Sequence, residues 1–517
     1  MRSHRYALII SLAAATLAAG CGGSSDGPDG RGADAVRTDL SGSRGALIVE
    51  PPPRITLLAA AAFNQSLGAS STGQALKTLA GEPHCDIALH KYQYSTVSGT
   101  GTPTRASGAL MIPVATSSPG TQAARCAGPR PMVLYAHGTT AERFYNIANI
   151  AESTNGGNAE ASVLAAFFAA QGFIVVAPNY AGYDSSDLDY HPYLNHDQQA
   201  KDMVDSLVAG RKALASLGQY QTTDSGNLMV TGFSQGGSVA MATQRELQRM
   251  NIAYTAGAPM SGAYAVKGFV DRIFQGGPEP RTPLGTPIPL GGPILGTMLI
   301  RSYQRSYGGL YSVPSEIFSS KFAAGIETLI PTATATTSGL LNNVLLPAAA
   351  LFAPDPLRGE DQISALIQQQ AGVAIYDANN HLINATFRSA YNTGAASTAV
   401  MRQRLEDNDL RLAAFIPGRP TMLCAARNDP TVFTAFNHDE MVSFYNGAGL
   451  ITAGLITPVD VDPDTIDPSS PFAMLQGGFK QQKTLGTITT LNYHGNVLPF
   501  CAVAVRGFFQ QVLAAQP

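Results

Sequence analysis

The chain has 517 residues and a formal charge of −3, with 33 Lys and Arg against 36 Asp and Glu. This near-balance argues against nucleic-acid binding, which needs a clearly basic surface. Hydrophobic residues make up 45% of the chain, which excludes global disorder and allows a large core, and the absence of Trp excludes a Trp stacking platform.

The first residues have the pattern of an export signal. A basic start precedes the apolar stretch Ala7–Ala19, which is too short to span a bilayer comfortably and ends in small residues, so residues 1–20 are predicted to be removed. The next residue, Cys21, closes a segment that resembles the lipobox of bacterial lipoproteins, although Leu17 stands four places before the Cys and the usual pattern has it three before. We therefore expect export, with Cys21 as the candidate lipidation site. Residues 21–50, rich in Gly, Ser and Asp, are expected to be a flexible tether.

Hydrophobic patterning beyond the tether predicts an α/β core. An antiparallel hairpin is expected between His90 and Pro113, followed by apolar strands that alternate with helices. Strands are expected at 131–136, 173–178, 227–231 and 254–260, and helices at 161–170, 201–217 and 238–250. Strands that are apolar throughout and alternate with helices indicate a mostly parallel sheet with helices on both faces.

This alternation stops near Val266. It resumes with a strand at 420–426, another at 487–493 and a closing helix at 498–513. We therefore expect core segments at 51–265 and 413–517 that are separated by a cap insert at 266–412. An insert that leaves after one core strand and returns before the next is expected to cover the carboxyl edge of the sheet.

A candidate nucleophile follows the strand at 227–231. The segment Gly232–Gly236 fits the pattern G-x-S-x-G around Ser234, and so does Gly23–Gly27, which lies in the tether. Only Ser234 has the strand before it and the helix after it that a nucleophile elbow requires. The small residues allow a tight turn, and the helix N-terminus directs N–H groups toward developing negative charge.

A serine nucleophile needs a base, and the base needs a carboxylate to orient it. On this fold the three follow in the order Ser, acid, His. The acid candidate is Asp429, directly after the strand 420–426, while Asp439 and Glu440 are weaker. The base candidate is His494, after the last predicted strand, and its rival is His438, which is expected to lie on a helix.

The oxyanion that forms after attack needs two donors. We expect one from the backbone N–H of Gln235, the residue after the nucleophile, and one from Thr139, in the loop after the strand 131–136. His137 is expected to shape that loop. His191 and His196 could bind a metal ion, yet no third ligand stands out, and no zinc-type Cys/His cluster is present.

Four cysteines follow Cys21, and an even number in an exported chain suggests two disulfides with three possible pairings. We favour Cys85–Cys126 and Cys424–Cys501. Cys424 lies five residues before the acid candidate and Cys501 seven after the base candidate, so a bond between them would fasten the two together.

The Asp-rich stretch 459–467 suggests Ca²⁺, because alternate carboxylates can face one hard cation. It lacks the Gly and the closing Glu of a helix–loop–helix calcium site, so we expect a solvated surface loop. We therefore predict no metal and no other cofactor.

Taken together, these motifs resemble the α/β-hydrolase superfamily and, within it, the secreted lipase and esterase group. The segments that carry the resemblance are 107–113, 137–139, 178–183, 191–194, 232–237, 428–429 and 494–495. One departure is Asn179, where many relatives carry Asp. The resemblance implies an acyl-serine intermediate on Ser234, with His494 as base, Asp429 as its orienter and no cofactor.

The function expected is hydrolysis of carboxylic esters with an apolar acyl chain. The alternatives are a depolymerase of extracellular polyesters, a peptidase on the same three residues, and an exported binding lipoprotein without activity. Contact with a membrane is expected only through the N-terminal lipid anchor, which would place the protein in the cell envelope, as an outer-membrane or periplasmic lipoprotein, unless it is secreted. The oligomeric state is left open.

Overall fold

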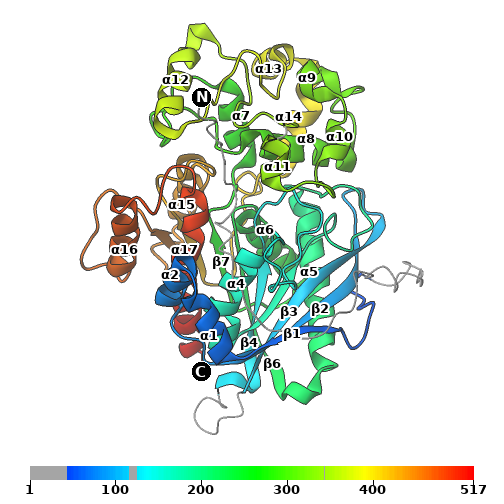
Figure 1. The fold of residues 1–517 in the computed structure, drawn as a ribbon, viewed down its shortest axis with the longest axis vertical. Coiled ribbons are helices and arrows are strands. Elements are labelled where there is room, and N and C mark those ends of the chain that lie inside the picture. Colours follow the sequence, from blue (N-terminus) through cyan, green and yellow to red (C-terminus); the bar gives the residue numbers. More distant parts are fainter. Residues whose placement is uncertain (1–43, 116–124, 343, 517) are drawn as a thin grey trace.

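The computed structural model describes residues 44–115, 125–342 and 344–516 (Figure 1). The predicted signal, Cys21 and most of the tether lie outside the described residues.

One nine-stranded sheet forms the centre of the fold, in the order β1-β2-β3-β5-β4-β6-β7-β8-β9. The first pairs, β1–β2, β2–β3 and β3–β5, are antiparallel, and every later pair is parallel. The bounds are β1 Arg54–Leu58, β2 Asp86–Val97, β3 Pro103–Val114, β4 Gly128–Ala136, β5 Ile174–Pro178, β6 Thr222–Phe233, β7 Ala256–Met260, β8 Thr421–Ala425 and β9 Ile456–Asp460. The expected hairpin and the strands expected up to residue 426 are all present.

Helices cover both faces of the sheet, as the apolar strands predicted. Strands β5, β7 and β8 are buried along their whole length. The helices outside the cap are α1 Ala60–Gly68, α2 Ser71–Ala80, α4 Asn158–Phe167, α5 His196–Ala215, α6 Gln235–Arg249, α15 His438–Gly447, α16 Ala473–Thr484 and α17 Tyr493–Ala514. Short 3₁₀ helices lie at Ala169–Gln171, Gly218–Tyr220, Pro314–Glu316, Pro356–Arg358, Ala396–Thr398 and Thr434–Phe436.

Among the described residues, α17 is the one helix with the length and apolar composition of a membrane span, and half of its apolar stretch is buried inside the protein. It packs against β8, β7 and α2, and a disulfide joins it to β8. These contacts are those of a core helix.

The predicted cap segment, 266–412, is helical and lies above the sheet at the top of Figure 1. Its helices are α7 Val266–Gln275, α8 Gly292–Tyr307, α9 Ser320–Ala323, α10 Ile326–Leu329, α11 Thr337–Asn342, α12 Glu360–Ala371, α13 Ala385–Asn392 and α14 Ala399–Asp407. A buried ion pair joins two of them, with Arg388 Nη2 2.5 Å from Glu360 Oε1. The Arg388 guanidinium also lies over the ring of Phe352, so the pair is enclosed by aromatic side chains.

Two expectations near the C-terminus are wrong. The strand expected at 487–493 is absent: residues 487–492 form a loop, in which Asn492 bonds the loop backbone, with Oδ1 accepting from Thr489 N–H and Nδ2 donating to Thr487 O. The last core strand is β9, which sequence reasoning missed because it contains Pro458 and is only partly buried, so it lacks a continuous apolar run. The closing helix consequently begins at Tyr493, so His494 lies in the first turn of α17 rather than in a loop after a strand.

The Asp-rich stretch is also not a fully solvated loop. It begins in β9, and Asp462 is buried, with 1% of its surface exposed. No group of three or more His, Cys, Asp or Glu side chains suited to a metal ion occurs within 44–115, 125–342 and 344–516.

Candidate active site

Ser234 lies in a sharp turn between β6 and α6. Its backbone has φ 60° and ψ −121°, in the left-handed region that a non-glycine residue rarely adopts. Such a conformation costs about 1–3 kcal/mol and needs support from its surroundings. Part of that support is a hydrogen bond from Ser234 N–H to Met260 O of β7, at 3.0 Å. The turn is the strand–helix elbow that the sequence predicted.

The glycines around Ser234 are required by the close approach of neighbouring backbones. A Cβ on Gly232 would lie 2.3 Å from Gly236 O, and a Cβ on Gly236 would lie 1.9 Å from Ala136 O. A Cβ on Gly237 would lie 2.3 Å from Met260 O. Because these atoms are backbone, a side chain at any of the three positions would push α6 away from the ends of β4 and β7.

The predicted acid and base are hydrogen-bonded to each other. Asp429 Oδ2 lies 2.6 Å from His494 Nδ1. The other carboxylate oxygen, Oδ1, accepts the backbone N–H groups of Thr431 at 2.9 Å and Val432 at 3.1 Å. These three contacts fix the carboxylate, which is 1% exposed. Since Nδ1 donates to Asp429, His494 Nε2 is free to accept a proton.

His494 Nε2 is buried and has no hydrogen-bond partner among the described residues. The His494 ring stacks on Phe233, the residue before the serine, with ring centroids 4.8 Å apart. Ser234, His494 and Thr139 line one pocket. The structure therefore places Ser234, at the end of β6, and His494, at the start of α17, on one pocket and hydrogen-bonds His494 to Asp429, in the loop after β8, while no hydrogen bond joins Ser234 to His494 among the described residues.

The rival groups are held elsewhere. His438 Nδ1 lies 3.0 Å from Asp439 Oδ1 and its Nε2 lies 3.3 Å from Leu423 O. Glu440 is paired with Arg411 at 2.9 Å. His438 starts α15, as expected, and lines neither of the pockets that contain Ser234.

The predicted oxyanion loop is held by a carboxylate that the sequence analysis missed. Glu160, on α4, accepts hydrogen bonds from Tyr135 Oη at 2.6 Å, Tyr145 Oη at 2.8 Å and Gly138 N–H at 3.1 Å. Burial raises the pKa of Glu160, and these donors oppose that shift. Because the Gly138 N–H already donates to Glu160, it is not available to an oxyanion. Thr139 is the next residue of the loop that lines the pocket of Ser234.

The second predicted donor, Gln235, is the first residue of α6, where backbone N–H groups have no partner within the helix. Its side chain is fixed by His191, with Gln235 Nε2 2.6 Å from His191 Nε2. His191 Nδ1 lies 2.9 Å from Ala181 O and therefore donates to it, which leaves Nε2 as the acceptor. Burial lowers the pKa of His191 to about 3, so the ring is neutral, as this arrangement requires.

The remaining two predicted histidines are buried in the interior. His137 stacks between Tyr145 and Tyr180, with ring centroids 4.4 and 4.1 Å away, and burial lowers its pKa to about 4. Its ring contacts the loop directly, with Nδ1 2.6 Å from Gly138 O. His196 Nδ1 lies 2.6 Å from Asn408 O, so this His supports the start of α5 rather than a metal ion.

Two disulfides are present. Cys85 is bonded to Cys126, and Cys424, in β8, is bonded to Cys501, in α17. This is the pairing that the sequence analysis favoured. The second bond ties the strand that precedes Asp429 to the helix that carries His494.

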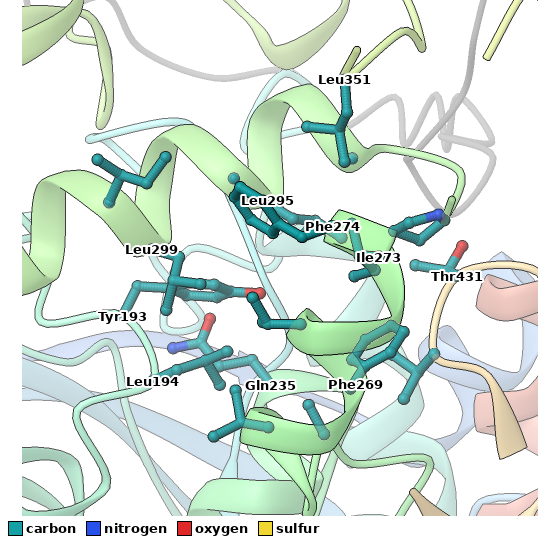
Figure 2. A pocket seen from close by; sticks show the side chains of 18 of the residues that line it. Tyr193, Leu194, Gln235, Phe269, Ile273, Phe274, Leu295, Leu299, Leu351 and Thr431 are labelled. Carbon is teal, nitrogen blue, oxygen red and sulfur yellow. The ribbon is translucent and has the colours of Figure 1, made fainter. Parts of the chain in front are cut away.

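Two pockets meet at Ser234. The first, which we call the apolar pocket, lies under the cap between α7 and α8 and has a volume of about 80 Å³. Figure 2 shows the side chains of Phe269, Ile273, Phe274, Leu295, Leu299 and Leu351 around it. The second, which we call the wide pocket, lies between α2, α4 and residues 482–500 and has a volume of about 380 Å³. Ser234, Leu295 and Thr431 line both pockets, whereas His494 lines only the wide one.

Comparison with known proteins gives a family match for part of the chain. Residues 160–275 match the sequence profile of the prolyl oligopeptidase family, Peptidase_S9. This segment includes Ser234 but neither Asp429 nor His494. No curated protein sequence matches the chain.

Among solved structures, the chain is similar to the rice cell wall degrading esterase LipA from Xanthomonas oryzae. The TM-score is 0.66 and the identity 25%, over 92% of this chain and 100% of that one. It is also similar to a candidate hydrolase from Legionella pneumophila, with a TM-score of 0.61 and 20% identity over 91% of this chain and 99% of that one. The second likeness concerns the fold alone.

Proposed function

The chain belongs to the α/β-hydrolase superfamily, and we propose that it is an exported serine esterase. In this proposal Ser234 is the nucleophile, His494 the base and Asp429 the group that orients the base. The observation that carries the proposal is the 2.6 Å bond between Asp429 and His494, which leaves a buried, unpartnered Nε2 in the pocket of Ser234. The two disulfides fit a protein that works outside the cytosol.

The reaction begins when His494 Nε2 accepts the Ser234 hydroxyl proton while Ser234 Oγ attacks the ester carbonyl carbon. The carbonyl oxygen becomes an oxyanion. It is stabilised by the backbone N–H of Gln235 and by the second expected hydrogen-bond donor, Thr139. His494 then returns the proton to the alcohol oxygen as the carbon–oxygen bond breaks, which leaves an acyl-Ser234. Water, activated by the same Nε2, releases the carboxylic acid and restores the serine.

The apolar pocket supports an acyl chain as the part of the substrate that lies beneath the cap. Apart from Ser234 and Gln235 at its mouth, its polar groups are few, namely Tyr193 and Thr431. Hydrocarbon that leaves water for such a lining gains about 0.8 kcal/mol for each buried methylene. The LipA structure to which the chain is similar is itself that of an esterase.

The match to the prolyl oligopeptidase profile favours a second candidate, cleavage of peptide bonds by the same serine. A peptide substrate needs polar partners for its backbone on both sides of the scissile bond. The apolar pocket offers few, so we favour the ester. Action on an ester-bearing polymer, which the description of LipA as cell wall degrading suggests, is a variant of the same chemistry.

A p-nitrophenyl ester series, measured beside a prolyl p-nitroanilide, tests the proposal. We expect ester turnover that rises from acetyl to medium acyl chains, and no turnover of the anilide. Ser234→Ala should abolish turnover while leaving the thermal melting curve intact. Ester turnover that survives in Ser234→Ala would refute the mechanism, and a preference for the anilide would establish the peptidase.

A further inference from the structure

The position of His494 indicates which of the two pockets receives the alcohol part of the ester and which receives the acyl chain. On the proposed mechanism His494 must deliver its proton to the oxygen of the leaving alcohol, so that oxygen must lie on the His494 side of Ser234. His494 lines the wide pocket and not the apolar one. The acyl chain must then extend the other way, under the cap.

We propose that the wide pocket binds the alcohol part of the ester, and that this alcohol is hydroxylated, as a polyol or a sugar is. This inference rests on the proposed esterase function and goes beyond it, because it assigns the second substrate subsite and its chemistry.

The wide pocket is lined mostly by apolar side chains, among them Leu76, Leu79 and Phe500, but unlike the apolar pocket it also presents many polar groups, which supports a hydroxylated occupant. Amide and hydroxyl side chains enter it from three segments, α2, α4 and the 482–496 region, and they include Thr72, Asn158, Ser162, Gln482, Thr487 and Asn496. Some of these are already engaged, since Asn158 Nδ2 donates to Ile150 O and Ser162 Oγ donates to Asn158 O. The side chains of Gln482, Thr72 and Thr487 make no hydrogen bond to other described residues, and they line the pocket partly or fully exposed.

The size of the wide pocket supports a group larger than a short alkyl alcohol. Its volume of about 380 Å³ is several times the 80 Å³ of the apolar pocket. A methyl or ethyl alcohol would therefore fill little of the wide pocket, whereas a glycerol or hexose group would fill more of it and reach its polar side chains.

The test compares methyl, hexyl and glyceryl decanoate, which share one acyl group and differ in the alcohol, and it measures the optimal acyl length separately with the p-nitrophenyl ester series. Thr487→Trp fills the wide pocket at an exposed position, and Leu299→Phe is the matched change in the apolar pocket. We expect Thr487→Trp to lower kcat/KM for the glyceryl ester about 10-fold relative to the methyl ester, with the optimal acyl length unchanged. Leu299→Phe should shorten the optimal acyl length and leave the alcohol preference unchanged.

The reverse pattern would overturn the assignment of the pockets. To test the chemistry of the alcohol, Gln482→Leu should lower the glyceryl-to-hexyl ratio of kcat/KM, and a wild-type enzyme that prefers the hexyl ester would overturn the hydroxylated alcohol. A wild-type protein that hydrolyses none of these esters would refute the proposed function itself, which distinguishes the two failures.

A second inference comes from a different observation, the hydrogen bonds of Asp462. This carboxylate lies just after β9 and accepts three donors on Oδ2: Tyr493 Oη at 2.6 Å, Asn428 Nδ2 at 2.9 Å and Lys483 Nζ at 2.5 Å. Tyr493 directly precedes His494, and Asn428 directly precedes Asp429. The Tyr493 hydroxyl stays protonated because burial and the neighbouring carboxylate raise its pKa.

We infer that Asp462 is a positioning residue that sets the distance between the proposed acid and base. Asp462 contacts neither Asp429 nor His494. Its Oδ2 instead accepts hydrogen bonds from the residues that directly precede them, Asn428 and Tyr493. Its location under α16 and α17, 1% exposed, keeps these bonds out of competition with water. A small shift of either neighbour would lengthen the bond between Asp429 and His494.

The test uses Asp462→Asn, Tyr493→Phe and their double variant, with Lys480→Met as the control on α16, because Lys480 bonds only the exposed Asp464 carbonyl. We expect each single change to lower kcat about 10-fold with KM for a p-nitrophenyl ester nearly constant. The double variant should lower kcat little further, since both changes remove the same contact, between Tyr493 Oη and Asp462 Oδ2. The pH at which kcat is half maximal should also move in Asp462→Asn, and Lys480→Met should match the wild type.

A purely structural role would instead lower the melting temperature and leave kcat and the pH profile of the folded enzyme unchanged. That result, or fully additive losses in the double variant, would overturn the inference.

Discussion

Removal of the Cys424–Cys501 disulfide tests whether the proposed acid and base, Asp429 and His494, depend on this covalent bond for their positions. The bond closes a loop of 77 residues, and the remote Cys85–Cys126 bond closes one of 41. The loop-entropy relation assigns about 4.5 kcal/mol of stability to the first and about 4 kcal/mol to the second. The two bonds should therefore contribute nearly equally to the free energy of unfolding.

Their effects on activity should differ, because only the first bond adjoins the site. Cys424 lies in β8, which leads directly to Asp429, and Cys501 lies in α17, whose first turn holds His494. We expect the pair Cys424→Ser with Cys501→Ser to lower kcat about 10-fold or more under conditions where the protein is still folded.

The assay is ester turnover and urea unfolding of both double-serine variants side by side, at a temperature well below either midpoint. The Cys85→Ser with Cys126→Ser variant is the matched control, with a similar loss of stability and a wild-type kcat. If both variants keep the wild-type kcat, the disulfide serves stability alone and our account of the site is wrong. Equal losses of kcat in both would show that destabilisation, not the tie, controls activity.

Four further outcomes are expected. His494→Ala should lower kcat by several orders of magnitude, and His438→Ala should leave kcat near the wild-type value. Near-normal turnover by His494→Ala would instead assign the role of base to His438. Glu160→Gln should lower kcat about 10-fold at constant KM, because it loosens the loop that carries the proposed second oxyanion donor, and a change in KM alone would contradict this. Burial raises the pKa of Asp202 to about 7, so between about pH 4 and pH 7 the folded protein keeps a proton that the unfolded chain has released. The free energy of unfolding should therefore fall as the pH rises through that window, by up to about 4 kcal/mol from this group. The urea midpoint of Asp202→Asn should depend less on pH than that of the wild type, and an identical pH dependence in both would refute the raised pKa of Asp202. EDTA should leave ester turnover unchanged, whereas a loss restored by Ca²⁺ would contradict the prediction of no metal.

The sequence was sufficient for the parts of the fold that follow from local patterns. Strands β4 to β8 each contain an apolar run of the length that buried parallel strands have, and the elbow around Ser234 has glycines where backbone contacts leave no room for a Cβ. The order of these elements followed from the alternation of strands and helices, whereas β4 and β6 begin earlier than predicted, at Gly128 and Thr222.

The parts that the sequence did not predict depend on contacts between distant residues. Glu160 is a single acidic residue in an apolar helix, and its role follows only from the positions of Tyr135, Tyr145 and Gly138. Asp462 lay in a stretch whose composition indicated a solvated loop. An acidic residue directly before an apolar helix, as Glu160 stands before the helix predicted at 161–170, would have been a usable signal.

The same distinction explains why His494 needs more support than the other two proposed catalytic groups. Ser234 and Asp429 follow β6 and β8, so the sheet itself sets their positions. His494 begins a helix that follows a loop, and no strand fixes it. Its position is set instead by the Cys424–Cys501 bond, by the ring of Phe233 and by the contact of Tyr493 with Asp462. Loss of these ties should therefore reduce proton transfer before it reduces substrate binding, so kcat should fall while KM changes little.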